Sequence, residues 1–290
     1  MRAVFGSSCH LRSAICLLIL FAAACRHTQV PLPNLTVTTS GDNSAARGEY
    51  IVRSVAVCGG CHAADPKNPD GPLSGGTEFH DWRIGTSRAS NLTSDRETGL
   101  GSWSEAEIVR AFRNGQRKDG RLLSPVMPYE WFHEMSDSDA LAVAHYLESL
   151  PPVHHEVKQS PNLMFKLGKV FFLHPLAGTS SSAGPDDGAY LAQHVGLCAD
   201  CHTPRSGLLQ KPDKRRLFKG MPHPPKQFPV KPPDISGTAI GTWSETDFVR
   251  AMRSGVTPAG KKLNPFMPWP ELKRMSDDDL HALYVYLRTR

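Results

Sequence analysis

The sequence predicts a mainly α protein made of two tandem copies of one small helical domain. The strongest observation is an internal repeat: residues 101–150 align without a gap on residues 241–290, and 21 of the 50 positions are identical. Helix-capping patterns recur at the same offset of 140 residues, and no segment alternates apolar and polar residues clearly enough to indicate a strand. A repeat of this length is too long for a solenoid unit, so we expect two similar domains in tandem.

Each copy is expected to contain three main helices. In the first copy Ser104 and Glu107 form a capping box, Gly115 ends that helix, and Ser136 caps the next one. The residues in the same places of the second copy are Ser244, Asp247, Gly255 and Ser276. The expected helices span 45–57, 104–115 and 136–150 in the first copy, and 188–197, 244–255 and the stretch from 276 onward in the second.

The N-terminus has the features of a secretory signal. An apolar stretch at 13–24 (SAICLLILFAAA) follows Arg2 and Arg12, and it is too short to span a bilayer comfortably. Cys25 comes next, as in a bacterial lipobox, although Ala22 stands where leucine is usual. We expect an exported, periplasmic protein anchored to the membrane through a lipid on Cys25. The alternative is a plain signal peptide that is cleaved after small residues.

Composition and charge exclude some functional classes. The chain is 40% hydrophobic and 21% charged, which is typical of a globular protein. Without the first 24 residues it contains 31 basic and 28 acidic residues, far from the basic surface that nucleic-acid binding needs. Cys9 and Cys16 lie in the signal, so two closely spaced pairs of cysteines remain beyond Cys25.

Both remaining pairs belong to a C-x-x-C-H motif, the attachment signature of c-type haem. Two thiols three positions apart share one face of a helical turn, where each can bond one vinyl group of a porphyrin, and the next histidine can bind the iron. Disulfides, a thioredoxin-like dithiol and a four-thiolate zinc site are the alternatives. The position of each motif in the repeat and the histidine after it favour two covalent haem c groups. The expected thiols are Cys58, Cys61, Cys198 and Cys201, and the expected proximal ligands are His62 and His202.

The sixth iron ligand is expected to be a methionine in each copy. Met127 and Met267 each follow their histidine by 65 residues, and both lie in a Pro-x-Met-Pro loop whose prolines exclude helix. Met135 and Met275 are also repeated, but each directly precedes a helix cap, which is typical of core packing. Met/His ligation suits electron transfer.

Other repeated or charged residues are less specific. Trp103 and Trp243 are shared between the copies, and either a haem edge or plain core packing explains them. The basic run at 211–219 (KPDKRRLFK) fits a docking face for an acidic redox partner or a solvated loop. The remaining histidines have no histidine partner 140 residues away, so we expect no shared ligand among them.

Several stretches resemble class I cytochromes c, and more closely the multihaem cytochrome c subunits of bacterial membrane-bound alcohol, aldehyde and gluconate dehydrogenases. They are ARGEYIVRSVAVCGGCH, SNLTSDRETGLGSWSEAEIVRAFRNG and MSDSDALAVAHYLESLPPV, and the resemblance covers 45–152 and 186–290. It implies two class I cytochrome c folds and an electron relay with no substrate of its own. That family usually has three haem domains and a C-terminal membrane anchor, whereas this sequence has two motifs and ends soon after its last helix.

We therefore expect a dihaem electron-transfer protein with no catalytic residues. Its donor would be a periplasmic dehydrogenase and its acceptor another cytochrome or a terminal oxidase. The alternative is a dihaem redox enzyme, of the peroxidase or thiosulfate-oxidising type, with one exchangeable axial position. The expected organisation is a signal peptide at 1–24, a flexible tether at 25–44, haem domains at 45–152 and 186–290, and a connector at 153–185.

Overall fold

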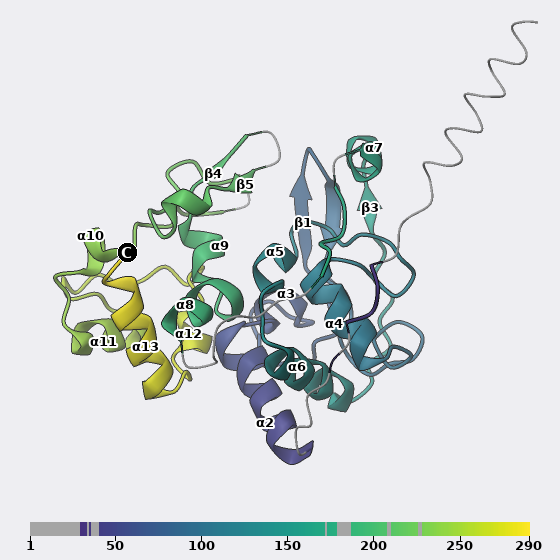
Figure 1. Ribbon diagram of the computed structural model, residues 1–290, viewed down its shortest axis with the longest axis horizontal. Coiled ribbons are helices and arrows are strands. Elements are labelled where there is room, and N and C mark those ends of the chain that lie inside the picture. The colour runs from purple at the N-terminus through teal and green to yellow at the C-terminus, as the bar shows by residue number, and fades with distance from the viewer. Residues whose placement is uncertain are drawn as a thin grey trace, which may run out of the picture.

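The computed structural model describes residues 30–33, 35, 41–171, 173–178, 187–207, 210–225 and 228–290. The expected signal peptide and Cys25 lie outside these residues, as do much of the tether and the TSSSAG stretch of the connector. Figure 1 shows two helical bodies side by side, the first half of the chain in purple to teal and the second half in green to yellow. We call residues 41–152 the first half and residues 187–290 the second half.

The three helices expected in each half are present. The first half contains α2 (Gly41–Tyr50), the π-helical turn η1 (Ile51–Val55), α3 (Gly59–His62), α4 (Glu105–Asn114), α5 (Tyr129–Phe132) and α6 (Asp137–Ser149). The connector contributes α7 (Leu163–Phe171). The second half contains α8 (Gly188–Tyr190), η2 (Leu191–Val195), α9 (Cys198–His202), η3 (Lys214–Arg216), α10 (Gly237–Ile240), α11 (Glu245–Ser254), α12 (Trp269–Leu272) and α13 (Asp277–Leu287).

The predicted helix signals form the contacts that their chemistry implies. Ser104 accepts a hydrogen bond from the backbone N–H of Glu107, whose carboxylate accepts one from the Ser104 N–H, so the capping box is complete. The corresponding box at Ser244 is complete as well. Gly115 and Gly255 end these helices in the left-handed conformation, at φ 75° and 66°, which glycine adopts without strain.

Short strands are the feature that the sequence did not predict. A three-stranded antiparallel sheet joins β1 (Glu78–Asp81), β2 (Gly85–Arg88) and β3 (Ser160–Pro161), with Phe79 opposite Ser87 and Thr86 opposite Ser160. The second half has only the pair β4 (Arg205–Ser206) and β5 (Lys211–Pro212) among its described residues. Strands of two to four residues are too short to show a period-2 pattern in the sequence. The fold is mainly helical, as predicted.

The first and last helices of each half cross in backbone contact. A Cβ atom added to Gly48 of α2 would collide with the carbonyl oxygen of Ala142 in α6, and one added to Gly188 of α8 would collide with that of Ala282 in α13. Both crossings occur at the same repeat positions. Only glycine permits this approach, because any larger residue would separate the helices.

The two halves meet in an interface in which each contact occurs twice. The Tyr190 hydroxyl donates to Asp139 at 2.8 Å and accepts from the Ser136 N–H at 3.0 Å. At the corresponding repeat positions, the Tyr50 hydroxyl donates to Asp279 and accepts from the Ser276 N–H at 2.8 Å. Reciprocal contacts of this kind are those of a two-fold symmetric dimer interface, here formed within one chain.

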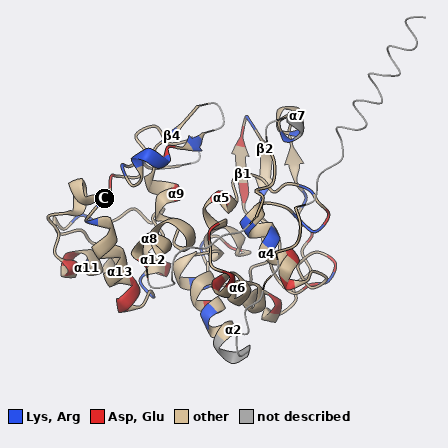
Figure 2. Ribbon diagram, in the orientation of Figure 1, with Lys and Arg blue, Asp and Glu red and all other residues tan. Residues whose placement is uncertain are grey.

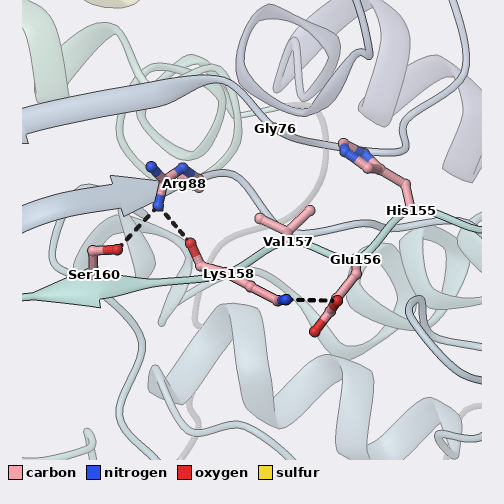
Figure 3. A pocket seen from close by; sticks show the side chains of 7 residues that line it. All are labelled: Gly76, Arg88, His155, Glu156, Val157, Lys158 and Ser160. Atoms are coloured by element: carbon pink, nitrogen blue, oxygen red, sulfur yellow. Dashed lines mark hydrogen bonds and ion pairs between the residues drawn. The ribbon is translucent and has the colours of Figure 1, made fainter.

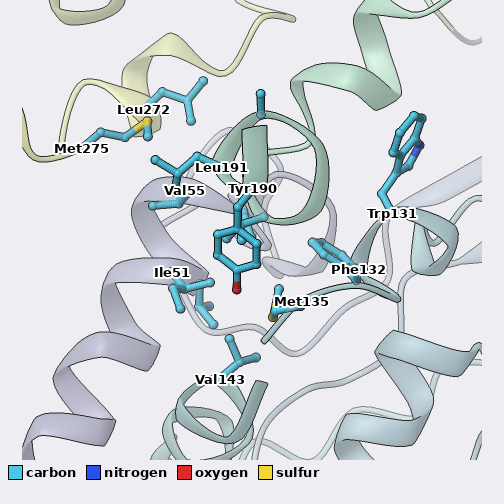
Figure 4. Close-up of a cluster of buried hydrophobic side chains, with 14 of the residues drawn as sticks. Ile51, Val55, Trp131, Phe132, Met135, Val143, Tyr190, Leu191, Leu272 and Met275 are labelled. Atoms are coloured by element: carbon cyan, nitrogen blue, oxygen red, sulfur yellow. The ribbon is translucent and has the colours of Figure 1, made fainter. Parts of the chain in front are cut away.

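Apolar side chains extend the same interface into one continuous core. The buried cluster contains residues of η1 and α6 together with residues of α8, η2 and α13, and Tyr50 of α2 packs against it. Figure 4 shows the Tyr190 ring from the second half between Ile51, Met135 and Val143 of the first. The two halves therefore pack as one body.

Three contacts thus determine the architecture: the helix crossing in the first half, the helix crossing in the second half, and the interface between the two halves.

No helix in the described part of the chain is long and apolar enough to cross a membrane.

Replacing Gly48 with Ala tests the helix crossing. We expect the free energy of unfolding to fall by about 3 kcal/mol, because the added methyl must push α2 away from α6. Denaturant unfolding followed by circular dichroism measures this loss. Gly168→Ala on α7 is the matched control, since outside the helix's own backbone the nearest described atom to its added Cβ is in the Leu173 side chain, at 3.9 Å. Equal stability of the two variants would contradict the crossing.

Candidate functional site

Both C-x-x-C-H segments begin from a strained residue after a π-helical turn. Val57 (φ 45°) and Leu197 (φ 55°) occupy the left-handed region, directly before Cys58 and Cys198. Non-glycine residues are rare there and concentrate at functional sites, as do single π turns. The strain occurs at the same position in both halves, so the turn into each motif is built in the same way.

The four motif cysteines are free thiols in this structure. Burial raises the pKa of Cys58 to about 12 and that of Cys198 to about 11. A redox-active dithiol needs the opposite, a thiol pKa lowered toward neutrality by positive charge. The surroundings of these thiols therefore disfavour thioredoxin-like chemistry.

Each motif histidine is held with one ring nitrogen hydrogen-bonded and the other free. The Nδ1 of His62 lies 2.8 Å from the carbonyl oxygen of Ser90, and the Nδ1 of His202 lies 2.7 Å from that of Pro233. Because a carbonyl oxygen can only accept, Nδ1 carries the proton and Nε2 keeps its lone pair. Burial lowers the pKa of both imidazoles, which keeps them neutral. A neutral, oriented imidazole is the form that binds a metal.

The two proline-braced methionine loops have the same backbone geometry. The Met127 N–H donates to Ser124 at 3.0 Å, and the Met267 N–H donates to Asn264 at 2.9 Å. The methionine carbonyl then accepts from the N–H two residues later in both loops. Each loop therefore holds its methionine in a fixed position.

One large cavity joins all these residues. Its volume is about 1240 Å³, and its walls include His62 with Met127 and His202 with Met267. In the part of the chain that the structure describes, these are the only two histidines on its walls. Most lining side chains are aliphatic or aromatic, and each motif contributes both cysteines. A single small-ligand site is usually smaller, so the cavity combines two sites.

Met135 and Met275 lie in the core, as expected, at 1% and 2% exposure. Met135 also reaches the cavity wall, so burial alone does not separate it from Met127. The choice of Met127 and Met267 as ligands stays a prediction.

Trp103 and Trp243 both line the cavity and pack against the core. A place beside the haem edge and a role in core packing are therefore compatible for these two residues.

Arg117 is a cavity residue that the sequence did not single out. Its guanidinium lies 5.6 Å from the centre of the Trp103 ring, and burial lowers its pKa. Its buried Nε has no hydrogen-bond partner among the described residues, with Asp119 the nearest carboxylate at 3.7 Å. An unsatisfied buried donor fits an anionic group such as a haem carboxylate. Thr257 stands at this position in the second half, so a search for repeated residues could not find it.

A polar contact connects α5 of the first half to the C-x-x-C-H motif of the second half. The indole N–H of Trp131 in α5 donates to Asp200 at 2.8 Å, and Asp200 lies between Cys198 and Cys201. Arg205 also pairs with Asp200. The pKa of Cys201 is raised by burial first, and also by the nearby Asp200 and Cys61. The two C-x-x-C-H motifs are therefore neighbours.

A second, shallower pocket lacks these features. Figure 3 shows it beside the sheet, where Arg88 donates to the Lys158 carbonyl and the Ser160 hydroxyl, and Lys158 pairs with Glu156. His155 bonds the Ser74 carbonyl at 2.8 Å. Its polar side chains are thus already occupied by hydrogen bonds and ion pairs within the protein.

The basic run at 211–219 forms η3 and its flanks, where Lys214 lies 5.3 Å from the centre of the Trp131 ring.

The chain is similar in sequence to several known cytochromes c. No protein-family model matches the chain. It is 31% identical over 264 residues to the cytochrome c subunit of the quinone-dependent alcohol dehydrogenase of Gluconobacter oxydans, covering 84% of this chain and 54% of that one. It is 29% identical over 272 residues to a diheme cytochrome c-type protein of Cereibacter sphaeroides, covering 88% of each.

A third relative is the gluconate 2-dehydrogenase cytochrome c subunit of Pantoea cypripedii, at 30% identity over 274 residues, with 86% of this chain and 60% of that one covered. The chain thus spans little more than half the length of the dehydrogenase subunits that it matches.

Trp131→Phe tests the contact between α5 and the second motif. We expect it to lower the free energy of unfolding by about 1 to 2 kcal/mol more than Trp269→Phe, because only Trp131 donates a hydrogen bond to a carboxylate. The Trp269 indole N–H is buried without a partner in the described residues, which makes that substitution the control. Denaturant titration of the haem-loaded protein measures both. Losses of equal size would show that the Trp131–Asp200 contact contributes nothing.

Proposed function

This chain is homologous to the cytochrome c subunits of bacterial dehydrogenases, and on that premise we propose that it is a dihaem c-type cytochrome that transfers single electrons. One observation carries the proposal. The same set of groups occurs twice around one apolar cavity: two thiols, a neutral histidine with a free Nε2, and a methionine in a braced loop.

The proposed attachment uses Cys58 and Cys61 in the first half, and Cys198 and Cys201 in the second. When bound, each haem supplies a one-electron Fe(III)/Fe(II) couple. The proposed axial pairs are His62 with Met127 and His202 with Met267. A methionine and a histidine on the same iron would raise its reduction potential and would leave no position for a substrate.

The protein supplies orientation and exclusion of water around these groups. The Ser90 and Pro233 carbonyls fix the two imidazole rings by accepting from Nδ1. The aliphatic and aromatic cavity walls would keep water from a bound haem, and Arg117 would offer a positive group to its carboxylate in the first half. No side chain needs to act as an acid, base or nucleophile.

Organisation and location complete the proposal. We assign the haem domains to 45–152 and 186–290, with 153–185 as the connector. Residues 1–24 would direct export to the periplasm, and a lipid on Cys25 would hold the protein at a membrane. The tether at 25–44 would separate that anchor from the first domain.

The proposed electron donor is a periplasmic dehydrogenase. This follows from relatives that are cytochrome c subunits of alcohol, gluconate and fructose dehydrogenases. The acceptor would be another cytochrome or a terminal oxidase. The basic η3 segment, exposed at Arg215, is the proposed contact for an acidic partner.

Absorption of the oxidised protein distinguishes this function from a dihaem redox enzyme. We expect the weak charge-transfer band of iron–methionine ligation at the red end of the spectrum, and we expect Met127→Ala and Met267→Ala each to remove about half of it. Met135→Leu and Met275→Leu are the controls and should leave the band unchanged. High-spin haem in the unaltered protein, or peroxidase turnover, would contradict a pure relay and favour the enzyme.

A further inference from the structure

Exposed large apolar side chains gather at one place on the surface. Among the described residues, Leu163 is 70% exposed, Trp82 64%, Leu167 51% and Met164 50%. We call these four residues the apolar patch. Asn162 joins its two parts, because its side chain donates to the Trp82 carbonyl at 2.6 Å and its N–H to the Ile84 carbonyl at 3.2 Å. In Figure 1, α7 lies beside the sheet end that carries this turn.

Helix α7 is anchored from its inner side only. Phe165 is 5% exposed, and Lys169 lies over its ring at 4.6 Å while donating to the Leu122 carbonyl at 3.1 Å. The outer face, with Leu163 and Leu167 one turn apart, contacts little of the protein. A contiguous apolar surface of this kind marks an interaction site.

The charge around the patch favours an anionic surface. Helix α7 contains no acidic residue, and its basic positions are blue in Figure 2. Lys169 is engaged with the Leu122 carbonyl on the inner side, so Lys166 is the exposed basic residue of this helix. The nearest acidic residue of the hairpin, Asp81, is paired with Arg83. A short helix with aliphatic residues outward, flanked by lysine and tryptophan, has the chemistry of a helix that lies in a bilayer interface.

The start of the described chain lies near the inner side of α7. The Val30 N–H donates to Gln116 at 2.7 Å, Gln116 pairs with Leu122, and the Leu122 carbonyl accepts from Lys169 of α7. Cys25 is five residues before Val30, so it can lie at most about 18 Å from it. A lipid at Cys25 would therefore enter the membrane close to the patch.

We propose that the apolar patch rests on the surface of a bilayer that contains anionic lipid, with Trp82, Leu163, Met164 and Leu167 in its interface. This contact fixes which side of the first half faces the membrane. It lies outside the haem cavity wall, and it does not depend on the proposed electron transfer.

A nitroxide label at position 167 tests the contact in the full, haem-loaded chain. Leu167→Cys and the control Val285→Cys are labelled, and the reduced protein is mixed with vesicles of phosphatidylethanolamine and phosphatidylglycerol. Val285 is 46% exposed on α13 of the other half, so its label starts from similar exposure. Electron paramagnetic resonance measures collisions of each label with oxygen and with a water-soluble nickel chelate.

We expect the ratio of oxygen to nickel-chelate collisions to rise several-fold at position 167 when vesicles are added, and to stay unchanged at position 285. Adding Leu163→Ser and Met164→Ser to the position-167 variant should remove most of that rise. No change at position 167 would overturn the proposal. Immobilisation of that label without vesicles, together with dimer formation in sedimentation, would also overturn it and would assign the patch to a second copy of the chain.

Discussion

The backbone contact between the first and last helices holds each half of the molecule together. Gly48 meets Ala142, and Gly188 meets Ala282, at the same repeat positions. The helix that contains the glycine leads through a π turn into the cysteines and histidine, whereas the other helix follows the methionine loop. The crossing therefore fixes the two sides of each site relative to one another. Without glycine at this point the helices would separate, and the imidazole and thioether would lose their common cavity.

The repeat also organises the contact between the halves. Tyr50 with Asp279 and Tyr190 with Asp139 are the same pair used twice, as in a symmetric dimer. This symmetry places the two attachment segments close together and merges their cavities into one space. Asymmetry remains where it affects charge: Arg117 faces the cavity in the first half, and Thr257 replaces it in the second. Two similar sites with different local charge suit an electron relay in which the two redox couples differ in reduction potential.

Much of this could be predicted from sequence because the signals are local and occur twice. The capping boxes at Ser104 and Ser244 and the helix ends at Gly115 and Gly255 depend on neighbouring residues only. The strands could not be found, since each has at most four residues. Contacts such as Tyr50 with Asp279 are 229 residues apart, and no local pattern encodes them. Arg117 could not be found from the internal repeat, because the corresponding residue of the second half is Thr257.

The two haems that we propose, one in each half, can be counted by the intact mass of the purified chain. The unaltered protein should carry two covalent haems, and the double substitution Cys58→Ala with Cys61→Ala should leave one, bound to the peptide that contains Cys198 and Cys201. The reciprocal substitution in the second half should leave the haem on the first. A chain without covalent haem, or one haem whose attachment needs cysteines from both halves, would contradict this account of the cavity.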